Sequence, residues 1–79
     1  MIDLKELIEF MIKGIVDFPD KVEIVNVVTE KTSIFEIKVD PEDVGKVIGK
    51  QGRNIKSIRS IMNAAAQKNE KRAIIEIIN

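Results

Sequence analysis

The central segment reads Val44-Gly45-Lys46-Val47-Ile48-Gly49-Lys50-Gln51-Gly52-Arg53-Asn54-Ile55-Lys56 and is rich in glycine and basic residues. Its glycines do not match a phosphate-binding P-loop, which needs four residues between its glycines and then Lys followed by Ser or Thr. They do not match the dinucleotide-binding fingerprint either, because that pattern needs one- and two-residue intervals after a strand. The pattern that fits is a Gly-x-x-Gly connection, from Gly49 to Gly52, between two helices.

The second of these helices begins with an unusual charge pattern. Helix N-termini carry unpaired N–H groups and a partial positive charge, so an acid or a Ser, Thr, Asp or Asn cap is typical there. This helix instead begins with Gln51, Gly52 and Arg53, with Lys50 before them and Lys56 after them. Cations at this end cost up to about 1 kcal/mol each, and a bound phosphate would offset that cost. The pattern predicts an anion site, and the alternative is that the glycines only form a tight turn.

The segment before this motif predicts one helix and a β-hairpin. Asp3 and Glu6 have the spacing of a capping box, and apolar residues at helical period predict a helix over residues 4–15. Residues 22–28 and 33–39 alternate with period two and are rich in β-branched side chains, which is typical of strands. The short polar connection between them predicts that the two strands pair as a hairpin.

The rest of the chain predicts two more helices and a last strand. Asp40 as N-cap and Pro41 at the first helical position predict a short helix that ends before Gly49. A longer helix follows over about residues 53–68, and residues 72–78 read as a terminal strand. In the order α-β-β-α-α-β, two helices separate the last two strands, so the last strand should lie parallel to an earlier one. We expect a two-layer α+β fold, with a three-stranded mixed sheet and the helices on one face.

Length and composition exclude most other classes of protein. The chain has 79 residues, of which 44% are hydrophobic, so residues 1–79 have room for one domain with a thin core. It has neither Cys nor His, which excludes disulfides, thiol nucleophiles, imidazole bases and the usual zinc sites. The remaining polar residues show no paired nucleophile and base. We therefore expect a protein that is not an enzyme and that binds no metal, cofactor or small-molecule substrate. Since no stretch approaches the roughly 18 apolar residues of a membrane-spanning helix, we also expect a cytoplasmic protein that binds no membrane.

Charge is distributed unevenly along the chain although the net charge is zero. Residues 1–43 contain 11 acids and 5 bases, whereas residues 44–69 contain 6 bases and no acid. Such asymmetry favours an anionic partner for the basic segment, and the alternative is a solvated basic helix face. The six basic residues are Lys46, Lys50, Arg53, Lys56, Arg59 and Lys68.

Two further groups of apolar residues concern packing and assembly. Phe10, Phe18 and Phe35 are the only aromatic residues, and each lies on or beside an apolar stripe, so we expect all three in the core. On the last helix, apolar residues extend beyond the core stripe, which predicts a surface for self-association, although Ala is also simply the best helix former. These residues are Ile61, Ala64 and Ala65.

The run Val47-Ile48-Gly49-Lys50-Gln51-Gly52-Arg53-Asn54-Ile55 resembles the central signature of KH domains, in which apolar-Ile-Gly-x-x-Gly-x-x-Ile joins two helices. The order α-β-β-α-α-β is similar to the bacterial, type II arrangement of that fold. Within a free-standing domain of this length, Asp40-Pro41-Glu42-Asp43-Val44-Gly45-Lys46-Val47-Ile48-Gly49-Lys50-Gln51-Gly52-Arg53 resembles the KhpA family of small bacterial RNA-binding proteins. The resemblance implies a type II KH fold that binds single-stranded RNA.

The resemblance also implies which residues contact RNA. The clamp on the RNA backbone would be Gly49, Lys50, Gln51 and Gly52, and the phosphate contacts would extend to Arg53, Lys56 and Lys46. The apolar floor under the bases would be Val44, Val47, Ile48 and Ile55, of which the last three can equally be core residues. Gly45 lies inside a short helix, where Gly costs about 1 kcal/mol relative to Ala, which suggests close approach of a base or another helix.

The family resemblance further implies a protein partner and a cellular role. The partner would be a larger protein that carries its own KH domain beside a second nucleic-acid-binding domain. Together they would act as an RNA chaperone or regulator of small RNAs, with a link to cell elongation and division. The leading alternative is a dimerisation module that acts mainly through such a partner, as a homodimer or a heterodimer. A duplex-DNA helix-hairpin-helix module is a weaker alternative, because strands flank the helices.

Overall fold

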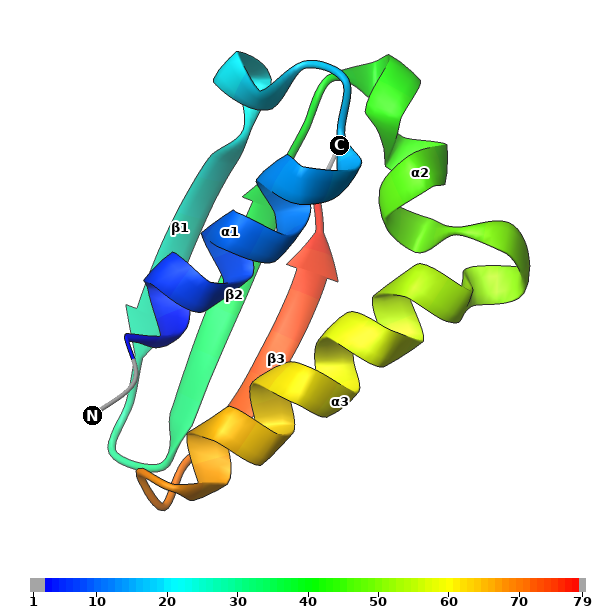
Figure 1. Cartoon of the computed structure of the whole chain (residues 1–79). Helices are drawn as coiled ribbons and strands as arrows, with labels where there is room; N and C mark the ends of the chain where they lie inside the picture. The colour runs from blue at the N-terminus through cyan, green and yellow to red at the C-terminus, as the bar shows by residue number, and fades with distance from the viewer. Residues whose placement is uncertain (1–2, 79) are drawn as a thin grey trace.

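The computed structural model describes residues 3–78, and its element order agrees with the predicted α-β-β-α-α-β order (Figure 1). Short 3₁₀ turns at Pro19–Lys21, Pro41–Asp43 and Lys50–Gly52 join some of the elements. The helices and strands are α1 (Leu4–Ile15), β1 (Glu23–Val28), β2 (Thr32–Lys38), α2 (Val44–Ile48), α3 (Arg53–Gln67) and β3 (Arg72–Ile77).

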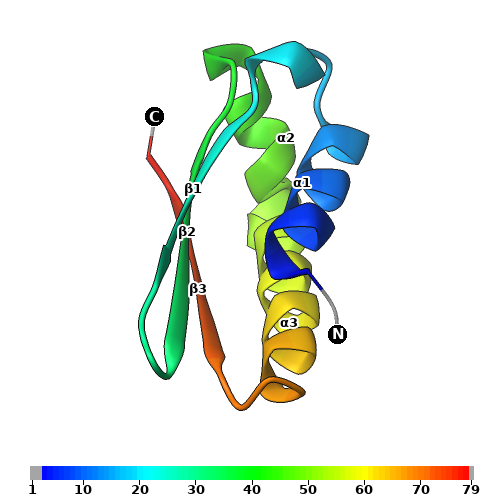
Figure 2. The same ribbon diagram turned by 90° about the vertical axis from the view of Figure 1, so that its left-hand side faces the viewer.

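The three strands form one mixed sheet in the order β1-β2-β3. β1 and β2 are antiparallel, as expected of a hairpin, and β3 lies parallel to β2. The register places Asn26 beside Phe35 and Phe35 beside Ile75. The helices cover one face of the sheet and leave the other face open (Figure 2). The predicted two-layer α+β fold and the parallel last strand are therefore confirmed.

Local sequence signals explain where α1 begins and which face it buries. The Asp3 carboxylate accepts a hydrogen bond from the backbone N–H of Glu6 at 3.1 Å and caps the helix. Leu4, Ile8 and Ile12 recur every four residues and are buried against the rest of the core. On β2, buried residues alternate with less buried ones, as expected for a strand with one buried face.

Only one of the three phenylalanines is in the core. Phe35 is fully buried on β2, as predicted, but the side chain of Phe10 is 78% exposed and that of Phe18 is 39% exposed. Phe10 lies two residues after the buried Ile8, about 200° around the helix, so it projects from the face that nothing covers. Phe18 lies in the connection between α1 and β1. The prediction of a core position is wrong for both residues.

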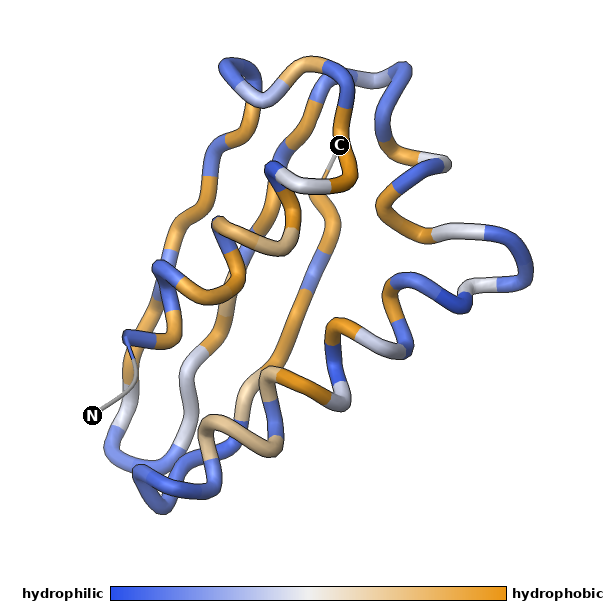
Figure 3. The backbone as a smooth tube through the Cα atoms, viewed as in Figure 1, coloured by the Kyte–Doolittle hydropathy of each residue, from blue (hydrophilic) through white to orange (hydrophobic). Residues whose placement is uncertain are grey.

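None of the helices in residues 3–78 is long and apolar enough to cross a membrane. The outer face of the sheet is partly apolar, since Val25 and Val27 of β1 are exposed there. Colouring by hydropathy shows the strands as mainly apolar segments and the connection between α2 and α3 as a hydrophilic one (Figure 3). The hydrophilic connection contains the Gly-x-x-Gly motif at one side of the molecule.

Candidate nucleic-acid interface

The Gly-x-x-Gly loop has a backbone that depends on both of its glycines. Gly49 ends α2 by donating its N–H to the carbonyl of Gly45 at 2.8 Å, and Gly52 donates to the carbonyl of Gly49 at 3.0 Å. Gly49 has φ 78° and ψ 170°, in a region that essentially only glycine occupies, and Gly52 is left-handed with φ 73°. Gln51 is also left-handed, with φ 58°. The tight connection between two helices is confirmed.

Asn54 closes this loop and was not singled out in the sequence. Its side-chain Nδ2 donates to the backbone carbonyl of Lys46 at 2.7 Å, which ties the first turn of α3 to α2. The amide lies directly over Gly49, because a Cβ built on Gly49 would be 2.7 Å from Asn54 Cγ. The absence of a side chain at Gly49 therefore makes room for Asn54. In the sequence, the signal for this role is an Asn two residues after the second glycine of the motif.

The start of α3 is open to an anion. Its N-cap, Gly52, provides no side-chain hydrogen bond, and its first turn contains no acidic residue. The backbone N–H of Arg53 donates to the carbonyl of Lys50, and the unpaired N–H groups after it lack a side-chain acceptor from the cap and have no carboxylate in the first turn. The anion site that the charge pattern of the sequence predicts at this helix start stays a prediction.

Three cations surround this helix start, and we call them the loop cations: Lys50, Arg53 and Lys56. All three are exposed. None of them forms an ion pair with a carboxylate within residues 3–78. Their positive charge is therefore available to a ligand.

Arg59 lies one turn beyond Lys56 and faces the free edge of β3. Its guanidinium donates to the backbone carbonyl of Ile75 at 3.4 Å. Asn63, one turn further, accepts from the backbone N–H of Ala73 at 3.0 Å. Side chains of α3 thus form hydrogen bonds with two backbone groups on the free edge of β3.

Lys46 was predicted to contact phosphate, but the structure pairs it with acids of its own chain. Its ammonium forms an ion pair with Asp17 and lies 3.6 Å from Asp43. The hydrogen bond from Lys46 to Asp17 is the main reason why the pKa of Lys46 is raised. Because its ammonium is paired with these carboxylates, Lys46 differs from the three loop cations, and its contact with phosphate stays a prediction.

Asp43 is the buried anchor of this ion-pair cluster. Its carboxylate accepts hydrogen bonds from the backbone N–H groups of Asp17 and Phe18, each at 3.0 Å. Burial by itself would raise the pKa of Asp43, but the two N–H donors and Lys46 outweigh burial and lower the pKa. The cluster joins the end of α1 to the start of α2, and so positions the helix that leads into the loop.

The proposed apolar floor is only partly on the surface. Val47 is fully buried and Ile55 is buried, so these two residues belong to the core. Ile48 is 38% exposed, and Val44 is half-buried. Of the two interpretations left open by the sequence, the core interpretation holds for Val47 and Ile55, and a contact with bases is possible only at Ile48 and Val44.

Gly45 is exposed, and a Cβ at this position would meet no atom within 4 Å. Within residues 3–78 no other helix comes within 4 Å of that Cβ position, so close packing of another helix of this domain does not explain Gly45. On α3, Ile61 is 48% exposed and Ala64 is exposed, whereas Ala65 is buried against the core. Ala65 is therefore removed from the predicted self-association surface, because its side chain packs inside the domain.

The chain is similar to a known protein family over almost its full length. The family described as the KH domain of KhpA/KhpB matches residues 5–77. The chain is 52% identical to the RNA-binding protein KhpA of Clostridium acetobutylicum and 51% identical to that of Clostridium perfringens, with 95% of this chain and 100% of each relative covered. It is 44% identical to the RNA-binding protein KhpA of Aquifex aeolicus, with 95% of both chains covered.

Proposed function

Because the chain belongs to the KhpA/KhpB KH-domain family, we propose that it binds single-stranded RNA and clamps the RNA backbone with the loop Gly49–Gly52. The observation that carries the proposal is the start of α3, which has neither an acid nor a side-chain cap and lies among the three loop cations. The similar proteins that are named RNA-binding protein KhpA support RNA as the ligand. In this proposal residues 1–79 act as one KH domain.

The contacts follow from the chemistry of the loop. A phosphate oxygen would accept from the unpaired N–H groups of α3, while the loop cations neutralise its charge and that of the neighbouring phosphates. The loop would hold about four nucleotides, as is common for KH domains. Bases would contact Ile48 and the exposed part of Val44. Since no aromatic ring lies in the loop or in α3, base stacking adds little and we expect weak binding.

The cellular role that we propose follows the family resemblance. The protein would act without catalysis, in the cytoplasm, as an RNA chaperone or regulator of small RNAs. It would do so together with a larger KH-domain protein, in a process linked to cell elongation and division. This role needs only reversible RNA binding at the loop and a surface for a protein partner.

A second candidate function is protein association through α3. Ile61 and Phe10 are exposed on either side of a hollow of about 340 Å³ between α1 and α3. Exposed apolar side chains around a hollow are typical of interaction sites. The partner would be a second copy or a larger KH-domain protein. Ile61→Asp should then prevent assembly, as measured by sedimentation, without weakening RNA binding.

The decisive test of RNA binding is the double variant Lys50→Asp with Gln51→Asp. It places two carboxylates at the tip of the loop, where they repel phosphate, and should abolish binding in a fluorescence anisotropy titration. The matched control is Lys21→Asp, a charge reversal on an exposed turn away from the loop, which should bind RNA normally. A double variant that folds and keeps its RNA affinity would disprove the clamp.

A further inference from the structure

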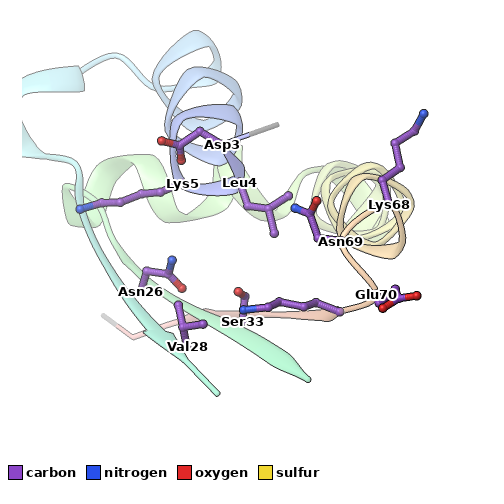
Figure 4. A pocket seen from close by; sticks show the side chains of 10 residues that line it. Asp3, Leu4, Lys5, Asn26, Val28, Ser33, Lys68, Asn69 and Glu70 are labelled. Atoms are coloured by element: carbon purple, nitrogen blue, oxygen red, sulfur yellow. The ribbon is translucent and has the colours of Figure 1, made fainter. Parts of the chain in front are cut away.

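A second hollow lies between the first turn of α1, the inner face of β1 and β2, and the turn after α3 (Figure 4). Its volume is about 590 Å³, within the range of small-ligand sites. It is far from the Gly-x-x-Gly loop, at the other end of α3 (Figure 1). The side chains that point into it or form its walls include Leu4, Asn26, Val28, Ser33 and Asn69.

Two polar side chains, Asn26 and Ser33, lie at the floor of this hollow, and Asn26 has a buried oxygen, Oδ1, without a hydrogen-bond partner. Ser33 is only 3% exposed, and its hydroxyl is directed into the hollow (Figure 4). Buried polar groups without partners are rare in native proteins, and each one calls for an explanation. Asn26 is also the only polar residue among the inward-facing positions of β1, where an apolar side chain would pack at lower cost.

The groups in the hollow match the chemistry of a nucleobase. A carboxamide offers a donor and an acceptor side by side, which is the pattern that a base edge recognises. Leu4 and Val28 supply apolar contacts beside these polar groups. Lys68 and Glu70 point away from the interior (Figure 4), whereas Lys71 donates from its ammonium to the backbone carbonyl of Thr29 at 3.4 Å, at the edge of the hollow.

The rim of the hollow and its position favour an RNA strand that is already held at the loop. The rim carries three cations, Lys5, Lys68 and Lys71, against the two carboxylates Asp3 and Glu70. α3 connects the loop with this rim and has 15 residues, a length of about 22 Å. Since residues 44–69 contain no acid, an RNA backbone meets no negative side chain of this segment along the way.

We propose that this hollow is a second RNA contact, which takes one unpaired nucleobase beyond the nucleotides held by the loop. The inference rests on the proposed RNA binding and extends it to a separate site. A short RNA would occupy the loop alone, whereas a longer RNA would also reach the hollow. The amide of Asn26 would pair with the base edge, and the hydroxyl of Ser33 would add a further hydrogen bond.

The test compares Asn26→Val with the unaltered protein on two RNAs. One RNA has about four nucleotides, enough for the loop, and the other is roughly three times longer. Asn26→Val removes the amide and should bind the longer RNA about tenfold more weakly, with no change for the short RNA. It should also unfold at a higher urea concentration, because an unpaired polar group has been removed. Val25→Thr, on the exposed face of the same strand, is the control and should change neither affinity.

The outcomes separate the two proposals. If Asn26→Val and Ser33→Ala both keep full affinity for the longer RNA while the loop double variant loses it, the hollow is not an RNA contact and the clamp stands. If the unaltered protein binds neither RNA, the clamp itself is wrong. NMR titration of the unaltered protein with the longer RNA adds a measurement that needs no variant. Unchanged amide signals at residues 26–33 and 69–71 would overturn the proposal.

Discussion

Replacing Gly49 by Ala should destabilise the domain far more than replacing Gly52 by Ala, although both glycines belong to the same motif. A Cβ at Gly49 would lie 2.7 Å from Asn54 Cγ and 2.8 Å from the backbone nitrogen of Asn54. That nitrogen belongs to the first turn of α3, so it cannot move without displacing the helix. A Cβ at Gly52 has space, since its nearest neighbour is the flexible end of Lys56 at 3.9 Å.

The backbone angles add to this difference. Gly49 has φ 78° and ψ 170°, where a residue with a Cβ costs about 1–3 kcal/mol. The steric conflict with Asn54 adds about 1–3 kcal/mol, as for other overpacked positions. The total of about 2–6 kcal/mol is a large share of the stability of a domain of this size. Gly52 is in the ordinary left-handed region, where Ala costs about 1–2 kcal/mol.

Urea denaturation followed by circular dichroism measures both variants against the unaltered protein. We expect Gly49→Ala to lower the urea concentration at the midpoint of unfolding much more than Gly52→Ala. The slope of the free energy of unfolding against urea concentration should stay the same in both variants. Asn54→Ala combined with Gly49→Ala should recover part of the loss, since it removes the side chain that meets the new Cβ. Equal destabilisation by the two single substitutions would refute the steric argument.

Three further predictions follow from the charges and the packing. Raising the salt concentration from 50 to 200 mM should weaken RNA binding roughly twentyfold. The reason is that contacts of the three loop cations with phosphates give a slope of about −2 for the logarithm of the affinity against the logarithm of the salt concentration. Anisotropy titrations should show that Lys46→Ala leaves this slope unchanged. The pKa of Asp43 is lowered on folding, so its contribution to stability is present above its ordinary pKa of 3.8 and is lost as the pH falls below that value. Asp43→Asn should therefore flatten the acid side of the stability profile measured by urea denaturation at a series of pH values. Ala65→Asp should cost more than about 3 kcal/mol and unfold the domain, because it buries a charge, whereas Ala64→Asp should leave the melting temperature nearly unchanged.

The sequence alone was sufficient to predict the helices, the strands and the loop. These features depend on residues within a few positions of one another, such as the cap at Asp3 and the period of two in β2. The open start of α3 was also readable, because the absence of acids in its first turn is a local property. Even the parallel pairing of β3 followed from the two helices that must cross over the sheet.

The tertiary structure decided which side chains are free to act. Lys46 looked equal to the loop cations, but it pairs with Asp17, which is 29 positions away in the chain, and only folding brings the two together. Phe10 looked like a core residue because it lies in an apolar segment, but burial depends on which face of α1 is covered by other elements. Asn26 appeared as one polar residue in an apolar strand, and only packing left its Oδ1 without a partner. Local patterns therefore determine the elements, whereas pairing and exposure are set by contacts between residues that are distant in sequence.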